Sequence, residues 1–195
     1  MTPLILILCT GNICRSPMAE ALMRQALAAR GVQADVVSRG LAAPEGRPPH
    51  PFARATALDH GLPLSDDKRS AQVNPVELRQ AVVVLVMEAR HRQRVQQLHP
   101  EAGGKCFVLR HWEDGADIPD PLHASADVFA QQWPQMQASC ALWVERLLQA
   151  GLLPMPSGAA SARQAPAGPT PPDCPTPPDS AAAGPTPPGA APDGS

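Results

Sequence analysis

Residues 4–22 read LILILCTGNICRSPMAEAL, and this stretch decides the fold. The apolar run Leu4–Leu8 is typical of a strand that is covered on both faces of a parallel sheet. After a short polar loop, Ser16 offers an N-cap oxygen and Pro17 suits the first position of a helix, which Gly31 can end. The stretch therefore predicts a buried strand, a loop and a helix in direct succession.

The rest of the chain continues this alternation. Further strands are expected at Val32–Ser38, Val82–Met87 and Cys106–Leu109, and further helices at Pro51–His60, Pro75–Gln80, Glu88–Leu98 and in a last segment that ends near Gln149. Because strand and helix alternate about four times, the sequence predicts an α/β domain of three layers, with a doubly wound, four-stranded parallel sheet and helices on both faces. Ligands of such sheets bind beyond the carboxyl ends of the strands, and Cys9 falls at such an end.

The last helix carries apolar residues at helical spacing, which predicts a stripe that packs in the core. These residues are Phe129, Trp133, Met136, Cys140, Val144 and Leu147. Pro134 lies inside the pattern and is expected to kink or restart the helix.

The end of the chain has a different composition. Of the 25 prolines, 13 fall between Pro154 and Pro192, among Ala, Gly, Ser and Thr and with PTPP three times. Such a segment has too few large apolar residues to offset its ordering entropy, so residues 154–195 are expected to be a disordered tail with polyproline II character behind a folded domain at residues 1–153. Its PxxP pattern leaves open a role in docking to an aromatic groove.

Charge and cysteine content limit the possible partners and cofactors. The net charge is −2, and the tail contains one basic and three acidic residues, so the domain is balanced and neither nucleic-acid binding nor membrane insertion is expected. The five cysteines include no CxxC pair, so neither a disulfide framework nor a metal site is expected, and no cofactor is expected. A reducing cytoplasm fits this cysteine usage, and no Lys or Arg precedes Arg15 to begin a signal peptide.

The loop between the first strand and the first helix predicts an anion site. Five residues separate Cys9 from Arg15, and a tight loop of this length can turn its backbone N–H groups inward while the helix adds its positive end. The planar fork of Arg15 can bind two oxygens of a tetrahedral dianion. The residues expected to line this cradle are Thr10, Gly11, Asn12, Ile13, Cys14 and Ser16, with Gly11 allowing the turn and Asn12 tolerating a positive φ.

The same positive field acts on the sulfur at the start of the loop. Free thiols ionise near pH 8.5, and helix N-termini and nearby cations shift ionisation to lower pH. Cys9 is therefore expected to be a thiolate that faces the centre of the bound anion, with Ser16 donating a hydrogen bond to it. The loop is not a Walker loop, because no GxxxxGK[ST] occurs.

The segment CTGNICRSPMAEA, together with DIPDP far downstream, resembles the low-molecular-weight protein tyrosine phosphatases. The similarity continues through VVSRG, VLVMEARHRQRV, PEAGGK and RHWEDGADIPDP, and so covers roughly residues 4–149. The last segment is most similar to bacterial members encoded with exopolysaccharide and capsule genes. The resemblance implies a flavodoxin-like fold.

The resemblance also implies a mechanism that needs no metal. Cys9 would attack phosphorus and form a phosphocysteine, while Arg15 and the loop amides stabilise the equatorial oxygens. Asp120 would protonate the leaving phenolate and then act as base; Asp117 competes for this role, and the Asp-Pro pair favours Asp120. The implied substrate is a phosphotyrosine protein, with a bacterial tyrosine kinase of exopolysaccharide synthesis as the suggested partner.

Several positions depart from the family pattern. Leu122 stands where an aromatic residue usually follows Asp-Pro to form a wall for the substrate ring, and the chain contains no Tyr. Ser38 is retained and is expected to support Asn12, whereas Lys68 replaces a His that is frequent in the family.

Cys14 has two interpretations, a protective disulfide partner of Cys9 or a small loop filler. The histidines expected at the surface are His50, His91, His111 and His123.

Three other functions compete with this one. Protein-arginine phosphatases have a similar loop but carry Thr where this chain has Ile13, so Ile13 favours an aromatic substrate. A thioredoxin-coupled arsenate reductase would need two more cysteines after the third strand, but residues 82–100 contain none and Cys106 alone is a poor substitute. A non-catalytic phosphopeptide binder or scaffold that acts through its tail has no need of Cys9, Arg15 and Asp120 together.

Overall fold

The computed structural model describes residues 2–155 of the chain. The predicted tail, apart from its first two residues, lies outside the described residues. All observations below concern residues 2–155.

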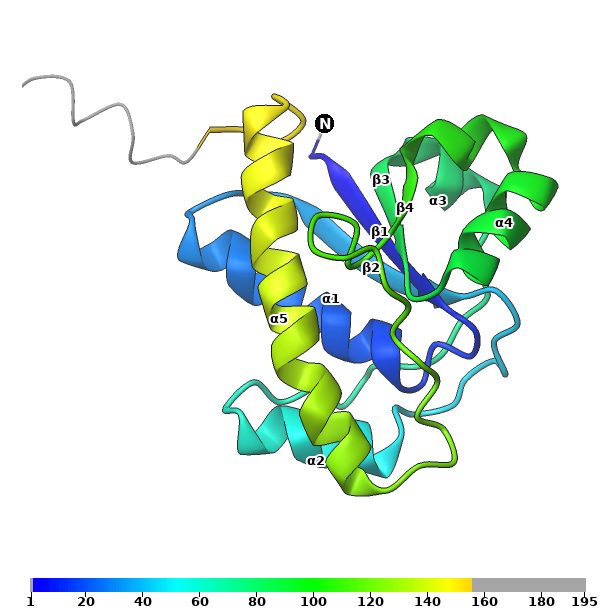
Figure 1. Ribbon diagram of the computed structural model, residues 1–195, viewed down its shortest axis with the longest axis vertical. Helices are drawn as coiled ribbons and strands as arrows, with labels where there is room; N and C mark the ends of the chain where they lie inside the picture. Colours follow the sequence, from blue (N-terminus) through cyan, green and yellow to red (C-terminus); the bar gives the residue numbers. More distant parts are fainter. Residues whose placement is uncertain (1, 156–195) are drawn as a thin grey trace, which may run out of the picture. The chain divides into compact units, whose positions relative to one another are not determined.

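The core of the structure is a parallel sheet of four strands in the order β2-β1-β3-β4 (Figure 1). The strands are β1 (Leu4–Cys9), β2 (Asp35–Gly40), β3 (Ala81–Val86) and β4 (Cys106–Val108). β1 pairs with β2 on one side and with β3 on the other, so the chain leaves β1 in one direction and later returns to its opposite edge. The predicted doubly wound, flavodoxin-like sheet is confirmed.

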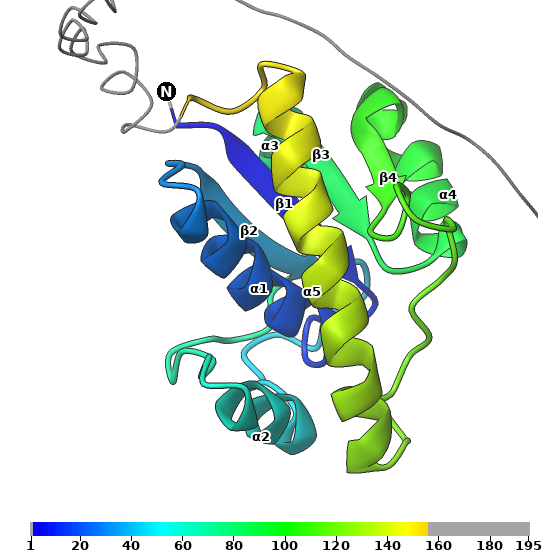
Figure 2. The ribbon, with the colours of Figure 1, turned by 60° about the vertical axis from the view of Figure 1, so that its left-hand side comes forward.

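Helices cover both faces of this sheet. They are α1 (Arg15–Ala29), α2 (Pro51–Asp59), α3 (Pro75–Gln80), α4 (Ala89–Leu98) and α5 (Ala126–Gln149), with a 3-10 helix η1 at Pro100–Lys105. Figures 1 and 2 show α1 and α5 side by side on one face, and α3 and α4 near the opposite face. Within residues 2–155, no helix has the length and apolar character that a membrane crossing requires.

The alternating side chains of β1 divide the interior into two clusters. Ile5 and Ile7 point into the larger cluster with α1, α2 and α5, whereas Leu6 and Leu8 point into the smaller cluster with α3, α4 and η1. All four side chains are completely buried. The continuous apolar run therefore results from burial on both faces, as the sequence predicts.

Two predicted boundaries near α1 are wrong. The helix already begins at Arg15, so Ser16 lies in its first turn and is not the N-cap. β2 begins at Asp35, not at Val32, because the N–H of Val32 donates to the carbonyl of Leu27 and closes the end of α1. Gly31 takes φ 63° at this end, as expected of a helix-terminating glycine.

The helix α5 is continuous through Pro134 and does not restart there. Its predicted core stripe is confirmed, because all six residues are buried. A buried Gln132 on the same helix donates from Nε2 to the carbonyl of Pro119 at 2.9 Å. The helix thus holds the segment that contains the DIPDP motif.

The glycine at the end of β2 is required by its surroundings. A Cβ at Gly40 would lie 2.7 Å from the carbonyl oxygen of Thr10 and 2.8 Å from Cβ of Ala43. We expect Gly40→Ala to lower the free energy of unfolding by about 1–3 kcal/mol, because backbone must shift to admit the methyl group. Urea denaturation measures this. Gly104→Ala is the control, since no atom lies within 4 Å of its added Cβ; equal losses in the two variants would contradict the packing argument.

Candidate active site

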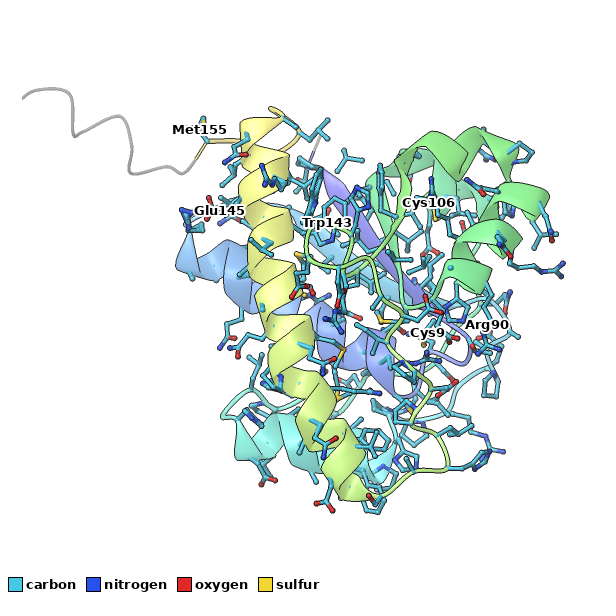
Figure 3. The ribbon with its side chains drawn as sticks, in the orientation of Figure 1. Cys9, Arg90, Cys106, Trp143, Glu145 and Met155 are labelled. Atoms are coloured by element: carbon cyan, nitrogen blue, oxygen red, sulfur yellow. The ribbon has the colours of Figure 1, made fainter. Side chains whose placement is uncertain are left out.

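The site lies at the carboxyl ends of β1 and β3. Cys9 is the last residue of β1, and Glu88 follows β3 as the N-cap of α4. Because β1 and β3 are parallel neighbours whose connections leave in opposite directions, both residues lie at the switch point of the sheet. Figure 3 labels Cys9 and Arg90 at this edge.

Asn12 gives the loop its shape. It has φ 54° and is the one non-glycine residue with positive φ in the described chain, whereas Gly11 does not adopt such a value. The prediction that Gly11 provides the conformational freedom of the turn is therefore wrong. The N–H of Asn12 donates to the sulfur of Cys9 at 3.2 Å, so this turn directs an amide at the sulfur.

The side chain of Asn12 fixes this conformation through three hydrogen bonds. Nδ2 donates to Oγ of Ser16 at 3.0 Å and to Oγ of Ser38 at 2.9 Å, as expected for Ser38, and Oδ1 accepts from the N–H of Ala71 at 3.1 Å. Ser38 in turn donates to the buried carboxylate of Glu20 at 2.6 Å. A chain of polar groups therefore supports the loop from behind.

The sulfur of Cys9 lies 3.0 Å from Oγ of Ser16 in the first turn of α1. No side chain caps the N-terminus of α1, and the N-cap position is held by Cys14. A helix N-terminus without a capping side chain offers its free N–H groups and positive end to an anion.

The second cysteine of the loop has a different electrostatic environment. Burial, with the nearby carboxylate of Asp120 and the Cys9 sulfur, raises the pKa of Cys14 to about 12, so Cys14 remains a protonated thiol. The structure shows both Cys9 and Cys14 as free cysteines. Cys14 thus fills the base of the loop as a neutral side chain.

The guanidinium of Arg15 is buried, with 1% of the residue exposed. Nη1 donates to Oε1 of Glu88 at 2.6 Å and to the carbonyl of Ile118 at 2.8 Å. Nη2 lies 2.6 Å from Oδ2 of Asp120. The buried Nε has no partner. The Nε–H is therefore unused in the described structure, as expected of an arginine that completes its hydrogen bonds with a ligand.

The loop between β4 and α5, residues 109–125 and called the late loop below, carries both candidate acids, and their contacts separate them clearly. Oδ1 of Asp117 accepts from the N–H of Ala89 at 2.8 Å and so binds the first turn of α4. Asp120 instead pairs with Arg15, while its other oxygen accepts from the N–H of Leu122 at 3.3 Å. The structure therefore brings Asp120, and not Asp117, to the guanidinium above the loop.

Two functional neighbours were not identified from the sequence. Glu88 was expected only as the first residue of a helix, but it is the N-cap of α4, and hydrogen bonds from Arg90 and Arg15 outweigh the effect of burial and hold the pKa of its carboxyl below the ordinary value. His91 was expected at the surface, but it is 5% exposed and lies 2.9 Å from Oγ1 of Thr10 through Nε2. The signal that could have found them is their position directly after the β3 strand.

A groove extends from the loop along the segment between β2 and α2. It has a volume of about 760 Å³ and is lined by Ile13, Pro44, Arg47, Pro48, Pro49, His50, Pro51 and Arg54. The N–H of His50 donates to the carbonyl of Ile13 at 2.7 Å, which fixes the segment to the loop. Leu122, on the late loop, is 37% exposed. Apolar side chains on both loops are thus available to a substrate.

Together, a parallel doubly wound sheet, a Cys-x5-Arg loop at its switch point and an aspartate above the arginine define a cysteine-dependent phosphatase. The model of the family described as "Low molecular weight phosphotyrosine protein phosphatase" matches residues 4–151. This chain belongs to that family.

Relatives in sequence and in structure agree with this membership. The "Probable low molecular weight protein-tyrosine-phosphatase EpsP" of Ralstonia nicotianae is 36% identical over 151 residues, which span 77% of this chain and 100% of the relative. The structure of the tyrosine phosphatase Wzb from Escherichia coli K30 in complex with sulphate is 33% identical, with a TM-score of 0.68 over 75% of this chain and 99% of that one. The YwlE arginine phosphatase from Geobacillus stearothermophilus is 30% identical, with a TM-score of 0.68 over 77% and 96%.

Variants of Asn12 can separate backbone strain from lost hydrogen bonds. Asn12→Ala and Asn12→Gly both remove the three side-chain bonds, but only alanine must also adopt an unfavourable positive φ. We expect the alanine variant to be less stable than the glycine variant by about 1 kcal/mol. Urea denaturation of the pair measures the difference; equal stability would show that the φ of Asn12 carries no conformational cost.

Proposed function

We propose that this phosphatase hydrolyses phosphotyrosine in proteins through a phosphocysteine on Cys9. The observation that carries the proposal is the convergence of three groups at one edge of the sheet: the Cys9 sulfur, the buried Arg15 guanidinium and the Asp120 carboxylate. These groups supply a nucleophile, a binder of phosphate oxygens and an acid, which are the parts that phosphoryl transfer requires.

The first step transfers the phosphoryl group to sulfur. The Cys9 thiolate attacks phosphorus, an S–P bond forms, and the bond from phosphorus to the tyrosine oxygen breaks. Asp120 gives its proton to the departing phenolate, so tyrosine leaves neutral. Arg15 and the loop amides hold the three equatorial oxygens while charge spreads over them.

The second step returns the enzyme to its starting state. A water molecule attacks phosphorus, and the Asp120 carboxylate takes one proton from it. An O–P bond forms and the S–P bond breaks, which releases inorganic phosphate and the Cys9 thiolate. The Ser16 hydroxyl, 3.0 Å from the sulfur, can stabilise the thiolate as it leaves.

Asp120 must change partners between the free enzyme and the complex. In the described structure its carboxylate pairs with Nη2 of Arg15 at 2.6 Å. A phosphate dianion repels that carboxylate and competes with it for Arg15, which favours release of Asp120 from the guanidinium toward the leaving oxygen. The exposure of one third of the Asp120 side chain is consistent with such a movement.

Apolar side chains near the loop favour tyrosine over arginine as the phosphorylated residue. Ile13 lines the groove with a branched apolar side chain, and Leu122 is exposed two residues after Asp120, so both offer apolar surface to a phenyl ring. The structural similarity to YwlE arginine phosphatase keeps phosphoarginine as the second candidate. Arsenate reduction is less supported, because burial raises the pKa of Cys106 to about 12 and makes it a poor thiol for disulfide exchange.

The resemblance of the RHWEDGADIPDP segment to bacterial members of exopolysaccharide systems supports a tyrosine kinase of exopolysaccharide synthesis as the substrate protein. The curated relatives named EpsP and Wzb are consistent with this placement. The four described cysteines are free, which is consistent with a reducing cytoplasm.

Substitution of the acid tests the mechanism. We expect Asp120→Asn to lower kcat on a phosphotyrosine peptide by about 10²–10⁴-fold, because an amide cannot protonate the phenolate. The loss should be much smaller on an aryl phosphate whose leaving group is already acidic, since that group departs as an anion. Steady-state kinetics on both substrates measures the difference.

Asp117→Asn is the matched control, because Asp117 binds the first turn of α4 and an asparagine retains that hydrogen bond. Its rates should stay near those of the wild type. Normal turnover of the peptide by Asp120→Asn, or a larger loss in Asp117→Asn, would overturn the assignment. Faster hydrolysis of a phosphoarginine peptide than of the phosphotyrosine peptide by the wild type would favour the second candidate.

A further inference from the structure

We propose that His91 is a positioning residue that holds the first peptide after the nucleophile, so that one turn at the start of α4 fixes both ends of the Cys9–Arg15 loop. The proposal rests on the proposed function, since it concerns the same loop. It assigns to His91 and to the Thr10 side chain a role that the loop motif does not contain.

The geometry joins residues that are far apart in the sequence. Nε2 of His91 lies 2.9 Å from Oγ1 of Thr10, which directly follows Cys9. Three residues earlier on the same helix start, Oε1 of Glu88 lies 2.6 Å from Nη1 of Arg15. The two ends of the loop are thus bound to adjacent positions of a single helical turn.

The imidazole is isolated from water. The His91 side chain is 6% exposed, and its buried Nδ1 has no partner, so the bond to Thr10 is the side-chain hydrogen bond that orients the ring. Burial lowers the pKa of His91 to about 4, against the opposing effect of the Glu88 carboxylate. The ring is therefore neutral at physiological pH, and one nitrogen carries a proton.

The surroundings favour the tautomer with the proton on Nε2. In the alternative tautomer the Nδ1–H would be a buried donor without an acceptor, and such donors are rarer in proteins than unpaired acceptors. The carboxylate of Glu88, 3.5 Å from Nε2, also attracts a proton there. His91 therefore donates to Oγ1 of Thr10, and the direction of the bond stays the same across the working pH range.

The peptide of Thr10 is held from two sides as a result. Its carbonyl accepts from the N–H of Ala42 at 2.9 Å, in continuation of the β1–β2 pairing, and its side chain is held by His91. Together these contacts restrict rotation of the backbone between Cys9 and Gly11. Because stabilisation by loop amides depends on preorganised N–H directions, this restraint acts on phosphate binding and on turnover.

A double-mutant cycle tests whether His91 acts through Thr10. The variants are His91→Leu, Thr10→Val and the double variant, measured by kcat/KM on an aryl phosphate and by calorimetric binding of inorganic phosphate. Removal of one hydrogen-bond donor that contacts the transition state lowers kcat by about 10²–10³-fold in other enzymes. Because His91 acts only through Thr10, we expect kcat/KM to fall by about tenfold in each single variant. The double variant should lose no more than about tenfold, because both changes remove the same hydrogen bond.

Two further variants distinguish positioning from general packing. His91→Gln retains an N–H donor near the position of Nε2 and should restore kcat/KM to within about threefold of the wild type, as should Thr10→Ser. His123→Leu is the control for loss of a histidine, since His123 is exposed, and it should not change the rate. Urea denaturation of every variant reports whether the fold is retained.

If the losses in kcat/KM multiply, to about a hundredfold in the double variant, the proposal is wrong. It is also wrong if His91→Gln is inactive, or if His91→Leu has the rate of the wild type. If His91→Leu does not fold, the comparison of Thr10→Val with Thr10→Ser decides: equal rates in the two would contradict the proposal. If the wild type does not hydrolyse aryl phosphates, the proposed function fails, whereas the phosphate-binding cycle still tests the link between His91 and Thr10.

Discussion

The buried guanidinium of Arg15 is the constraint on which the rest of the site depends. A cation removed from water is costly unless hydrogen bonds and opposite charges compensate it. Here the compensation comes from two other segments: Glu88 after β3, and the DIPDP segment, which supplies the carbonyl of Ile118 and the carboxylate of Asp120. The Cys9–Arg15 loop, the start of α4 and the DIPDP segment must therefore meet for the cation to be buried, and the unpartnered Nε leaves a donor for a ligand.

This arrangement explains how a domain without net positive charge can bind a dianion. Attraction comes from one buried cation, the uncapped start of α1 and loop amides, all of which act at short range. The two loop thiols differ in their surroundings: burial keeps Cys14 a neutral thiol, whereas the Cys9 sulfur accepts the N–H of Asn12. The geometry of the loop, rather than the residue type, thus distinguishes the two cysteines.

The sequence is informative where the signal is local and incomplete where contacts are distant. The alternation of strands and helices and the strand-loop-helix unit follow from short segments, and the structure agrees with them. The support of Asn12 by Ser38, 26 positions away, was expected from the family resemblance alone. The burial of His91 was missed, because a polar residue in a charged helix does not by itself show that it faces Thr10, 81 positions away; only its place soon after a buried strand points to the site. The helix start at Arg15 was missed for a related reason: the expected Ser16 cap instead bonds the Cys9 sulfur.

The most direct test of the central claim is to identify the atom that receives the phosphoryl group. The enzyme is mixed with excess phosphotyrosine peptide, quenched with acid within the first turnovers, digested and analysed by peptide mass spectrometry. We expect one phosphate on the sulfur of Cys9, none on Cys14, and hydrolysis of the phosphocysteine at least as fast as steady-state turnover. A phosphate on any other residue would contradict this mechanism. So would steady hydrolysis of the peptide with no phosphate on Cys9, if it were also seen in a variant in which hydrolysis of the phosphocysteine is slow.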